Sequence, residues 1–230
     1  MGYTFRQILL PSSKYKLKAP YAMTAQYITV HNTANDAPAI NEVTYHNNNN
    51  NEVSFHVAID DKEAIQCIPF NRNAFHAGDG GDGNGNRKSI GIEICYSKSG
   101  GSRYEAAEEN AVHYIADLLF ERGWGIDRIK KHQDWSGKNC PHRILNEGRW
   151  ESFKQRVQQA LNNLKHPQVK GEMIVMDLLN PTGRVEAKEM IKRGVEEKLF
   201  TSKHEGMDKY SDAELIGYAV AYMNRKTKQK

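Results

Sequence analysis

Residues 90–95 of the chain place three isoleucines at alternate positions. Side chains along a β-strand point to opposite faces in turn, so Ile90, Ile92 and Ile94 share one face, which must be buried. Gly91 and Glu93 then share the opposite face. A strand with one wholly apolar face is stable only inside a covered sheet, and this predicts a layered domain with helices packed on the sheet.

Other segments fit that expectation. Alternating β-forming residues predict strands over residues 27–31, 54–60 and 64–68, with a hairpin around 60–63. Apolar residues at helical spacing predict helices over 39–45, 104–122 and 147–164. The asparagine run 47–51 and the glycine-rich stretch 78–86 are expected to be loops. The predicted fold class is α/β, a central mixed β-sheet flanked by helices, with a small mainly helical C-terminal domain.

The sequence changes character near residue 165. Residues 165–170 contain Pro167 and are interpreted as a linker, and helices are expected over 185–199 and 211–225. Ser211 followed by Glu214 is typical of a capping box at the start of the second helix. We therefore expect two domains, residues 1–165 and 166–230. From residue 165 onward, 13 Lys+Arg against 10 Asp+Glu give this part +3 of the chain's net charge of +4.

Bulk composition narrows the function classes only a little. A hydrophobic fraction of 39% and a charged fraction of 26% are ordinary for a globular protein. No run of 18 apolar residues predicts a membrane span, and the first twenty residues lack the apolar core of a secretory signal. Synthesis in the cytoplasm without a signal peptide is expected. The three cysteines are too few and too scattered for a disulfide framework, so one of them is expected to have a specific chemical function.

Two histidines and one cysteine are candidates for a metal site. His31 ends a predicted strand, and residues 131–142 bring His132, Lys138 and Cys140 into one polar loop where packing requires none of them. Imidazole and thiolate are ligands that zinc favours, and three protein ligands with an open fourth position characterise a catalytic site. Paired CxxC or HxxxH spacing, typical of structural zinc sites, is absent from the sequence.

Five motifs occur in a specific order: YITVHNT, SFHVAID, AFHAGDG, SIGIEIC and HQDWSGKNCPH. In that order they resemble the type 2 N-acetylmuramoyl-L-alanine amidases, a family that includes phage endolysins, bacterial autolysins and the peptidoglycan recognition proteins. Among these, the chain most resembles the amidase endolysins of Bacillus phages and prophages. The resemblance covers roughly residues 20–160.

The resemblance implies Zn²⁺ held by His31, His132 and Cys140, and cleavage of the amide bond between N-acetylmuramic acid and L-alanine. It places the catalytic glutamate in the strand that carries Glu93, and a basic residue that stabilises the tetrahedral intermediate at Lys138. A glutamate in so apolar a strand is energetically costly unless it faces a polar cleft, which agrees with a catalytic role for Glu93. The alternative is that Glu93 is a core residue paired with an arginine.

Substrate contacts are expected from three further residues. His76 belongs to a motif that borders the cleft in the family, while Asn32 and Thr33 follow the first ligand and could orient it or contact the peptide. Some phage members use a tyrosine where this chain has Phe55. Phenylalanine cannot move a proton, so that role should be absent and Glu93 should carry it.

The expected partners are bacterial peptidoglycan and its associated wall polymers, reached after release from the cell. The chain is expected to be a monomer, with neither nucleic acid nor membrane as a partner. Three alternatives stay open: a peptidoglycan-binding protein or regulator without hydrolysis, a basic nucleic-acid or polymerase-binding regulator, and a serine or cysteine hydrolase. The intact Cys140 argues against the first, and the lack of a helix-turn-helix, RNP or GxSxG motif argues against the others.

Overall fold

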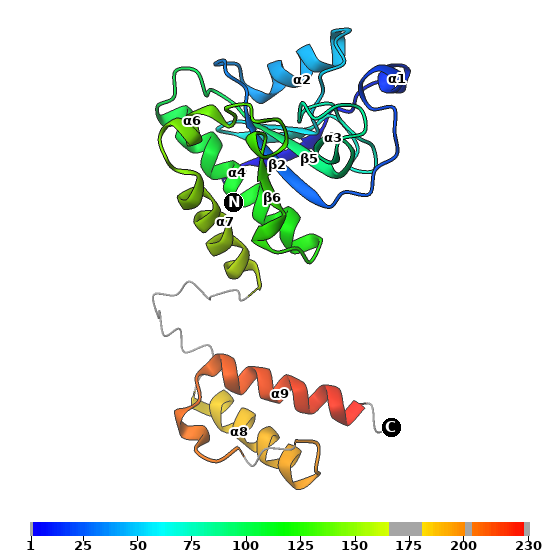
Figure 1. The fold of residues 1–230 in the computed structure, drawn as a ribbon. Coiled ribbons are helices and arrows are strands. Elements are labelled where there is room, and N and C mark those ends of the chain that lie inside the picture. The colour runs from blue at the N-terminus through cyan, green and yellow to red at the C-terminus, as the bar shows by residue number, and fades with distance from the viewer. Residues whose placement is uncertain (1, 166–180, 201–203, 228–230) are drawn as a thin grey trace. The chain divides into compact units, whose positions relative to one another are not determined.

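The computed structural model describes residues 2–165, 181–200 and 204–227, and divides the chain into two compact units within residues 1–168 and 169–230 (Figure 1). Each unit has its own hydrophobic core. In the described residues, no helix is both long and apolar enough to cross a membrane.

A six-stranded mixed sheet forms the centre of the first unit, in the order β1-β4-β3-β5-β2-β6. All neighbouring strands are parallel except β3 and β4, which form the antiparallel hairpin expected around residues 60–63. The strands are β1 (Thr4–Gln7), β2 (Tyr27–Asn32), β3 (Val57–Ile59), β4 (Glu63–Gln66), β5 (Ser89–Ile94) and β6 (Ile129–Lys131).

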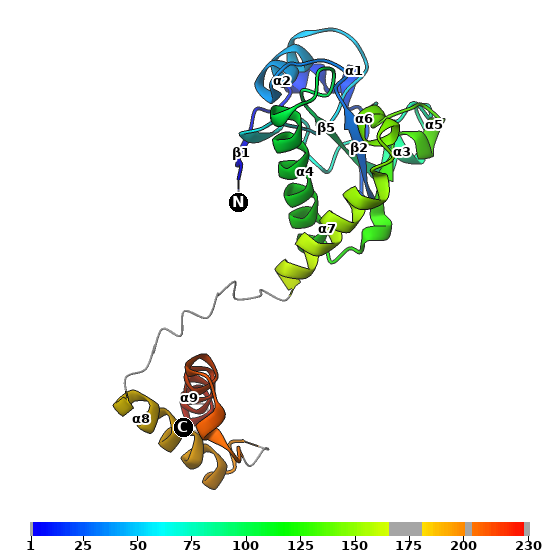
Figure 2. The same ribbon diagram turned by 90° about the vertical axis from the view of Figure 1, so that its left-hand side faces the viewer.

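The neighbouring interior strands β2 and β5 are nearly all buried. Ile90, Ile92 and Ile94 have no exposed surface, as the alternation predicts. On the same face, α4 (Ser102–Glu121) packs against β3, β4 and β5, and α7 (Trp150–Lys165) packs against α4 (Figure 2). Burial of these apolar faces is the main source of the unit's stability.

Shorter helices occupy the remaining connections. Helix α2 (Ala39–Asn48) lies above the sheet in Figure 1 and contacts β3 and β4. The others in this unit are α1 (Tyr15–Lys18), α3 (Asn84–Lys88), α5 (Gln133–Ser136) and α6 (His142–Asn146), with 3₁₀ turns η1 (Ser12–Lys14) and η2 (Ile126–Arg128).

The second unit is a pair of helices, α8 (Pro181–Glu196) and α9 (Asp212–Thr227), with a 3₁₀ turn η3 (Met207–Lys209) between them. Its core contains Ile191, Phe200 and Leu215. The capping box forms as expected: the Glu214 carboxylate accepts the Ser211 backbone N–H at 2.8 Å, and the Glu214 N–H donates to Ser211 Oγ at 3.3 Å.

The fold class expected from the sequence is confirmed. Two differences concern segments with weak patterns: α2 runs on into the asparagine run, and α3 occupies the end of the glycine-rich stretch. The short strands β1 and β6 had no clear alternation and were not predicted. Apart from its first residue, which belongs to α7, the expected linker at 165–170 lies outside the described residues.

Candidate metal centre and active site

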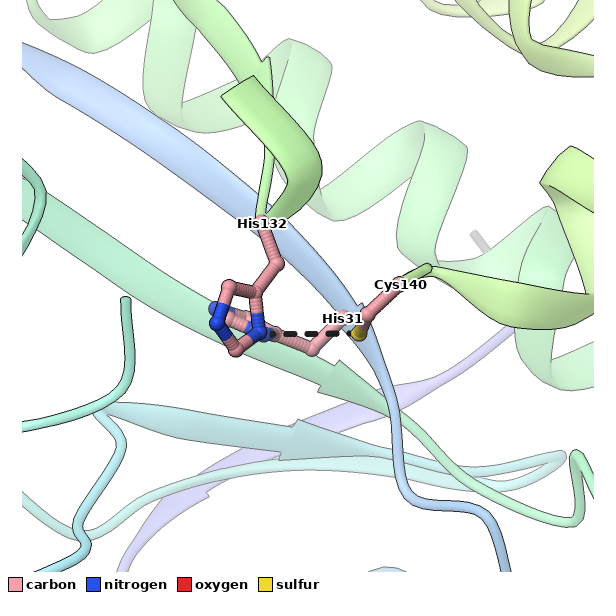
Figure 3. A group of neighbouring side chains, drawn as sticks. All are labelled: His31, His132 and Cys140. Atoms are coloured by element: carbon pink, nitrogen blue, oxygen red, sulfur yellow. Dashed lines mark hydrogen bonds between the residues drawn. The ribbon is translucent and has the colours of Figure 1, made fainter. Parts of the chain in front are cut away.

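Two segments far apart in the sequence, β2 and the loop of residues 131–142, bring His31, His132 and Cys140 together (Figure 3). His31 lies near the carboxyl end of β2, His132 follows β6, and Cys140 precedes α6. Since β6 pairs with β2 in parallel, His31 and His132 lie at the same end of the sheet, where both strands have their carboxyl ends. The Cys140–Pro141 peptide bond is cis.

The loop between the last two ligands is fixed by local hydrogen bonds. The Gln133 N–H donates to the Cys140 carbonyl at 3.1 Å, which closes the loop on itself. The indole N–H of Trp135 donates to Thr29 Oγ1 at 2.9 Å and ties the loop to β2. The positions of the cysteine and the histidine therefore depend on each other and on the central strand.

The potential ligand atoms lie within 4.8 Å of one another. His31 Nδ1 is 3.1 Å from His132 Nδ1 and 3.7 Å from Cys140 Sγ. The three residues are only 2%, 6% and 5% exposed. Zn–N bonds of about 2.0–2.1 Å and a Zn–S bond of about 2.3 Å in a tetrahedron place ligand atoms roughly 3.3–3.6 Å apart, so the two separations from His31 Nδ1 are compatible with a zinc site.

Burial lowers the pKa values of both histidines, that of His31 well below the usual range and that of His132 to about 4. Both rings are therefore neutral at pH 7, the form that binds metals. Burial and the nearby Glu93 raise the pKa of the Cys140 thiol to about 12. The Asn32 backbone opposes that shift, in the direction that an N–H donor to the sulfur gives.

Glu93 lies beside the trio because it is the register partner of His31 across β5 and β2. Burial, then repulsion from Glu42, raises the pKa of its carboxyl to about 8, and Lys138 opposes the shift. Its Oε2 atom is buried without a hydrogen-bond partner among the described residues. A partly buried carboxyl with one unpaired oxygen and a pKa near neutrality is suited to proton transfer.

Two adjacent cavities of about 400 and 620 Å³ flank the trio. Glu93, Glu42 and Thr33 line the first, and His132 lines the second. Lys138 is exposed and lines both cavities.

The three residues expected to contact substrate have different surroundings. Thr33 is partly exposed and lines the first cavity. Asn32 also lines it but is 6% exposed, and its Oδ1 accepts the Arg143 N–H at 3.0 Å. His76 lines the second cavity, yet it is 6% exposed and its Nδ1 lies 3.0 Å from His31 Nε2.

Three further residues near the site have structural roles. His56 Nδ1 accepts the Gly91 N–H at 2.9 Å, and His56 Nε2 donates to the Arg72 carbonyl at 3.0 Å. Cys95 is fully buried as a free thiol. Asp79, in the glycine-rich stretch, accepts N–H groups at the start of α3 and acts there as a helix cap.

Comparison with known proteins assigns the region that contains the trio to a protein family. The family model described as N-acetylmuramoyl-L-alanine amidase matches residues 21–143, which include His31, His132 and Cys140. The chain belongs to the N-acetylmuramoyl-L-alanine amidase family. The resemblance expected from the five motifs is thereby confirmed.

Relatives of this amidase family member share its first unit. N-acetylmuramoyl-L-alanine amidase XlyB of Bacillus subtilis (strain 168) is 60% identical over 162 residues, which cover 70% of this chain and 51% of XlyB. CwlA of the same strain is 63% identical over 156 residues, covering 68% of this chain and 57% of CwlA. The chain thus spans about half the length of these curated relatives. The solved structure of PlyL is 59% identical with a TM-score of 0.66, covering 67% of this chain and 97% of PlyL.

Proposed function

We propose that the first unit is a zinc-dependent peptidoglycan hydrolase that cleaves the amide bond between N-acetylmuramic acid and L-alanine. The observation that carries the proposal is the convergence of one His31 nitrogen, one His132 nitrogen and Cys140 Sγ within 4.8 Å of one another in a buried site. Membership of the amidase family supports the reaction type.

Zinc held by three protein ligands supplies Lewis-acid polarisation of a carbonyl and lowers the pKa of a water molecule by several units. The donor set favours zinc over magnesium or calcium, which prefer oxygen ligands. Neutral imidazoles and a thiol that must lose its proton on binding are the available ligands.

Glu93 is proposed as the group that moves protons. Hydrolysis of an amide requires a base for the attacking water and an acid for the departing nitrogen. The unpaired Oε2 atom, in a buried site beside the trio, can accept a proton and then return it. A pKa near the working pH makes both transfers accessible.

Lys138 is proposed to stabilise the negative charge that develops on the carbonyl oxygen. Its side chain lines both cavities and interacts electrostatically with Glu93, which places a cation at the proposed reaction site. Fixed positive charge at a developing oxyanion is among the strongest contributions to acyl-transfer catalysis. Thr33, at the wall of the first cavity, is proposed to contact the stem peptide.

Digestion of purified bacterial walls tests the assignment. New N-terminal alanine should appear without new reducing sugar ends, and the activity should disappear on chelation and return with Zn²⁺. New reducing ends would identify a glycosidase, and binding without either product would identify a recognition protein. Metal analysis of the purified protein should give one zinc per chain, and a protein purified without metal that binds none on titration would contradict the metal centre.

We propose that residues 166–230 form a separate domain that attaches the enzyme to the cell wall. The chain from residue 165 onward carries +3 of the net charge, which suits anionic wall polymers. Tyr218 is 37% exposed on α9 and could contact a carbohydrate. Removing residues 166–230 should spare cleavage of small soluble substrates but reduce co-sedimentation with walls; undiminished sedimentation would contradict the proposal.

The proposed setting is the bacterial wall after release of the enzyme from the cell, with the protein acting as a monomer and without nucleic acid or membrane as a partner. Analytical ultracentrifugation of the zinc-loaded protein tests the oligomeric state, and a concentration-dependent dimer would contradict it.

A further inference from the structure

The backbone segment at His76 and Ala77 contacts both histidines of the metal trio from the side away from the ligand atoms. His76 Nδ1 lies 3.0 Å from His31 Nε2, and His76 Nε2 lies 3.2 Å from the Ser89 carbonyl oxygen. Against the larger effect of burial, the Ala77 backbone raises the pKa of the His132 imidazole, as a nearby carbonyl acceptor does. One short segment therefore supports two ligands.

The hydrogen bonds define which ring nitrogens carry protons. A carbonyl oxygen can only accept, so His76 Nε2 must donate to Ser89. A neutral imidazole has one N–H, which leaves His76 Nδ1 as an acceptor, and His31 Nε2 must donate to it. The lone pair of His31 Nδ1 is then directed at His132 Nδ1 and Cys140 Sγ, where a metal would lie.

His132 is arranged in the same way. The Ala77 backbone acts on its pKa in the direction that a carbonyl acceptor gives, although burial has the larger and opposite effect. His132 Nε2 faces this segment, since a Cβ atom added at Gly78 would lie 3.3 Å from it. The Nδ1 atom, on the other side of the ring, faces His31.

The segment itself is held rigidly. The Oδ1 atom of Asn86, which is 4% exposed, accepts the backbone N–H groups of both His76 and Ala77 at 2.8 Å. The His76 ring lies directly over Gly91 of β5, where an added Cβ would approach within 2.8 Å of the ring. Only glycine leaves space for the ring at this position.

We propose that His76 and Ala77 form a shared hydrogen-bond support that fixes the tautomers of His31 and His132, and that His76 is a positioning residue for the metal. This inference rests on the proposed metal centre. It assigns His76 a function that differs from the substrate contact expected from the sequence.

Three substitutions at His76 separate this role from packing. In His76→Asn, the amide oxygen can occupy the Nδ1 position and accept from His31. In His76→Gln, the amide nitrogen reaches the Nε2 position and keeps the bond to Ser89, with more of the original volume, but the acceptor for His31 is lost. His76→Leu removes both hydrogen bonds.

Zinc affinity of the metal-free proteins, measured by competition with a chromogenic chelator at pH 7.5, is the readout. His76→Asn should bind zinc nearly as tightly as the wild type, whereas His76→Gln and His76→Leu should bind on the order of 10- to 100-fold more weakly. The visible spectrum of the Co²⁺-loaded proteins should follow the same grouping, because it reports ligand geometry.

Other outcomes overturn the inference. An acceptor at the Nδ1 position would not determine zinc affinity if all three variants bound zinc as tightly as the wild type, or if all three lost affinity equally. Tighter zinc binding by His76→Gln than by His76→Asn would exclude it as well. If His76→Leu does not fold, the Asn and Gln variants still decide. A wild-type protein that binds no zinc would instead remove the metal centre of the proposed function.

A second pair of variants leaves His76 unchanged. Gly91→Ala should displace the ring and weaken zinc binding, whereas Gly81→Ala, where an added Cβ meets nothing within 4 Å, should not. Equal zinc affinity in the two alanine variants would count against the positioning role.

Discussion

His31 and Glu93 lie opposite each other on the neighbouring parallel strands β2 and β5. Register partners point to the same face of a sheet, and the strands are separated by about 4.8 Å. The sheet therefore sets the distance between the imidazole of His31, the first of the proposed metal ligands, and the carboxyl group of Glu93. A pair of side chains built on two interior strands is more rigid than one built on loops.

Replacing Glu93 by glutamine should separate catalysis from metal binding. Glu93→Gln keeps the shape of the side chain but cannot accept a proton, so wall hydrolysis should fall by about 10²- to 10⁴-fold. Zinc content should stay at the wild-type level because Glu93 is not a member of the trio. Release of N-terminal alanine and metal analysis measure the two properties, and retained activity would move proton transfer to another group.

The pKa of Glu93 predicts a pH dependence of stability in the metal-free protein. Its folded-state pKa of about 8 exceeds the unfolded value, so the folded chain binds more protons between about pH 4.5 and 8. The contribution of Glu93 to the unfolding free energy should therefore decrease, by about 2–4 kcal/mol, as pH rises through that window.

Urea unfolding of the metal-free wild type and of Glu93→Gln at several pH values isolates this contribution, because the variant lacks the titrating group. Zinc should lower the carboxyl pKa through its positive charge and reduce the difference between the two proteins. Parallel stability curves without metal would show that Glu93 titrates equally in both states.

Lys138 should matter for turnover and little for folding. Its side chain is exposed, so Lys138→Met should change the free energy of unfolding by less than about 0.5 kcal/mol. Loss of the cation should lower kcat by about 10²- to 10³-fold, with part restored in Lys138→Arg. Lys62→Met, at an exposed turn between β3 and β4, is the matched control. Equal kcat in the two methionine variants would exclude the proposed role.

Lys18 is predicted to organise the wall of the first cavity. It is fully buried on α1, and its ammonium group donates to Asn49 Oδ1 at 2.9 Å and to the Val53 carbonyl at 3.2 Å. Both acceptors belong to residues that line the cavity. Lys18→Met should destabilise the protein by about 1–3 kcal/mol, because the Val53 carbonyl loses its partner.

The same variant should raise KM more than it lowers kcat, because the cavity wall moves while the metal ligands stay in place. Lys16→Met, at an exposed position of the same helix, should change neither stability nor KM. A Lys18→Met enzyme with wild-type KM would mean that residues 49–53 keep their position without this contact.

Much of the fold followed from local patterns in the sequence. The isoleucine alternation at 90–95 located a central strand, and apolar spacing located α4 and α7, because burial on one face leaves a periodic signal. Strand β1 leaves none, since all four of its residues are exposed at the sheet edge. Helix α2 continued through asparagines because its packing outweighs their weak helix propensity.

The site was predictable only in part. His31, His132 and Cys140 were chosen from residue type and family resemblance, and the structure brings their side chains together. The support behind them was not foreseen, because a backbone carbonyl at Ala77 carries no signature in the side-chain sequence. Asn86 looked like one more polar loop residue, although its amide holds the segment in place.

All three cysteine thiols of the chain are buried. Cys67 and Cys95 have no exposed surface, Cys140 is 5% exposed, and burial raises the pKa of each thiol. Oxidants and alkylating agents attack the thiolate, which is scarce under these conditions. Even before it acquires an ion, the protein should resist oxidative inactivation and keep its sulfur ligand chemically intact outside a reducing environment.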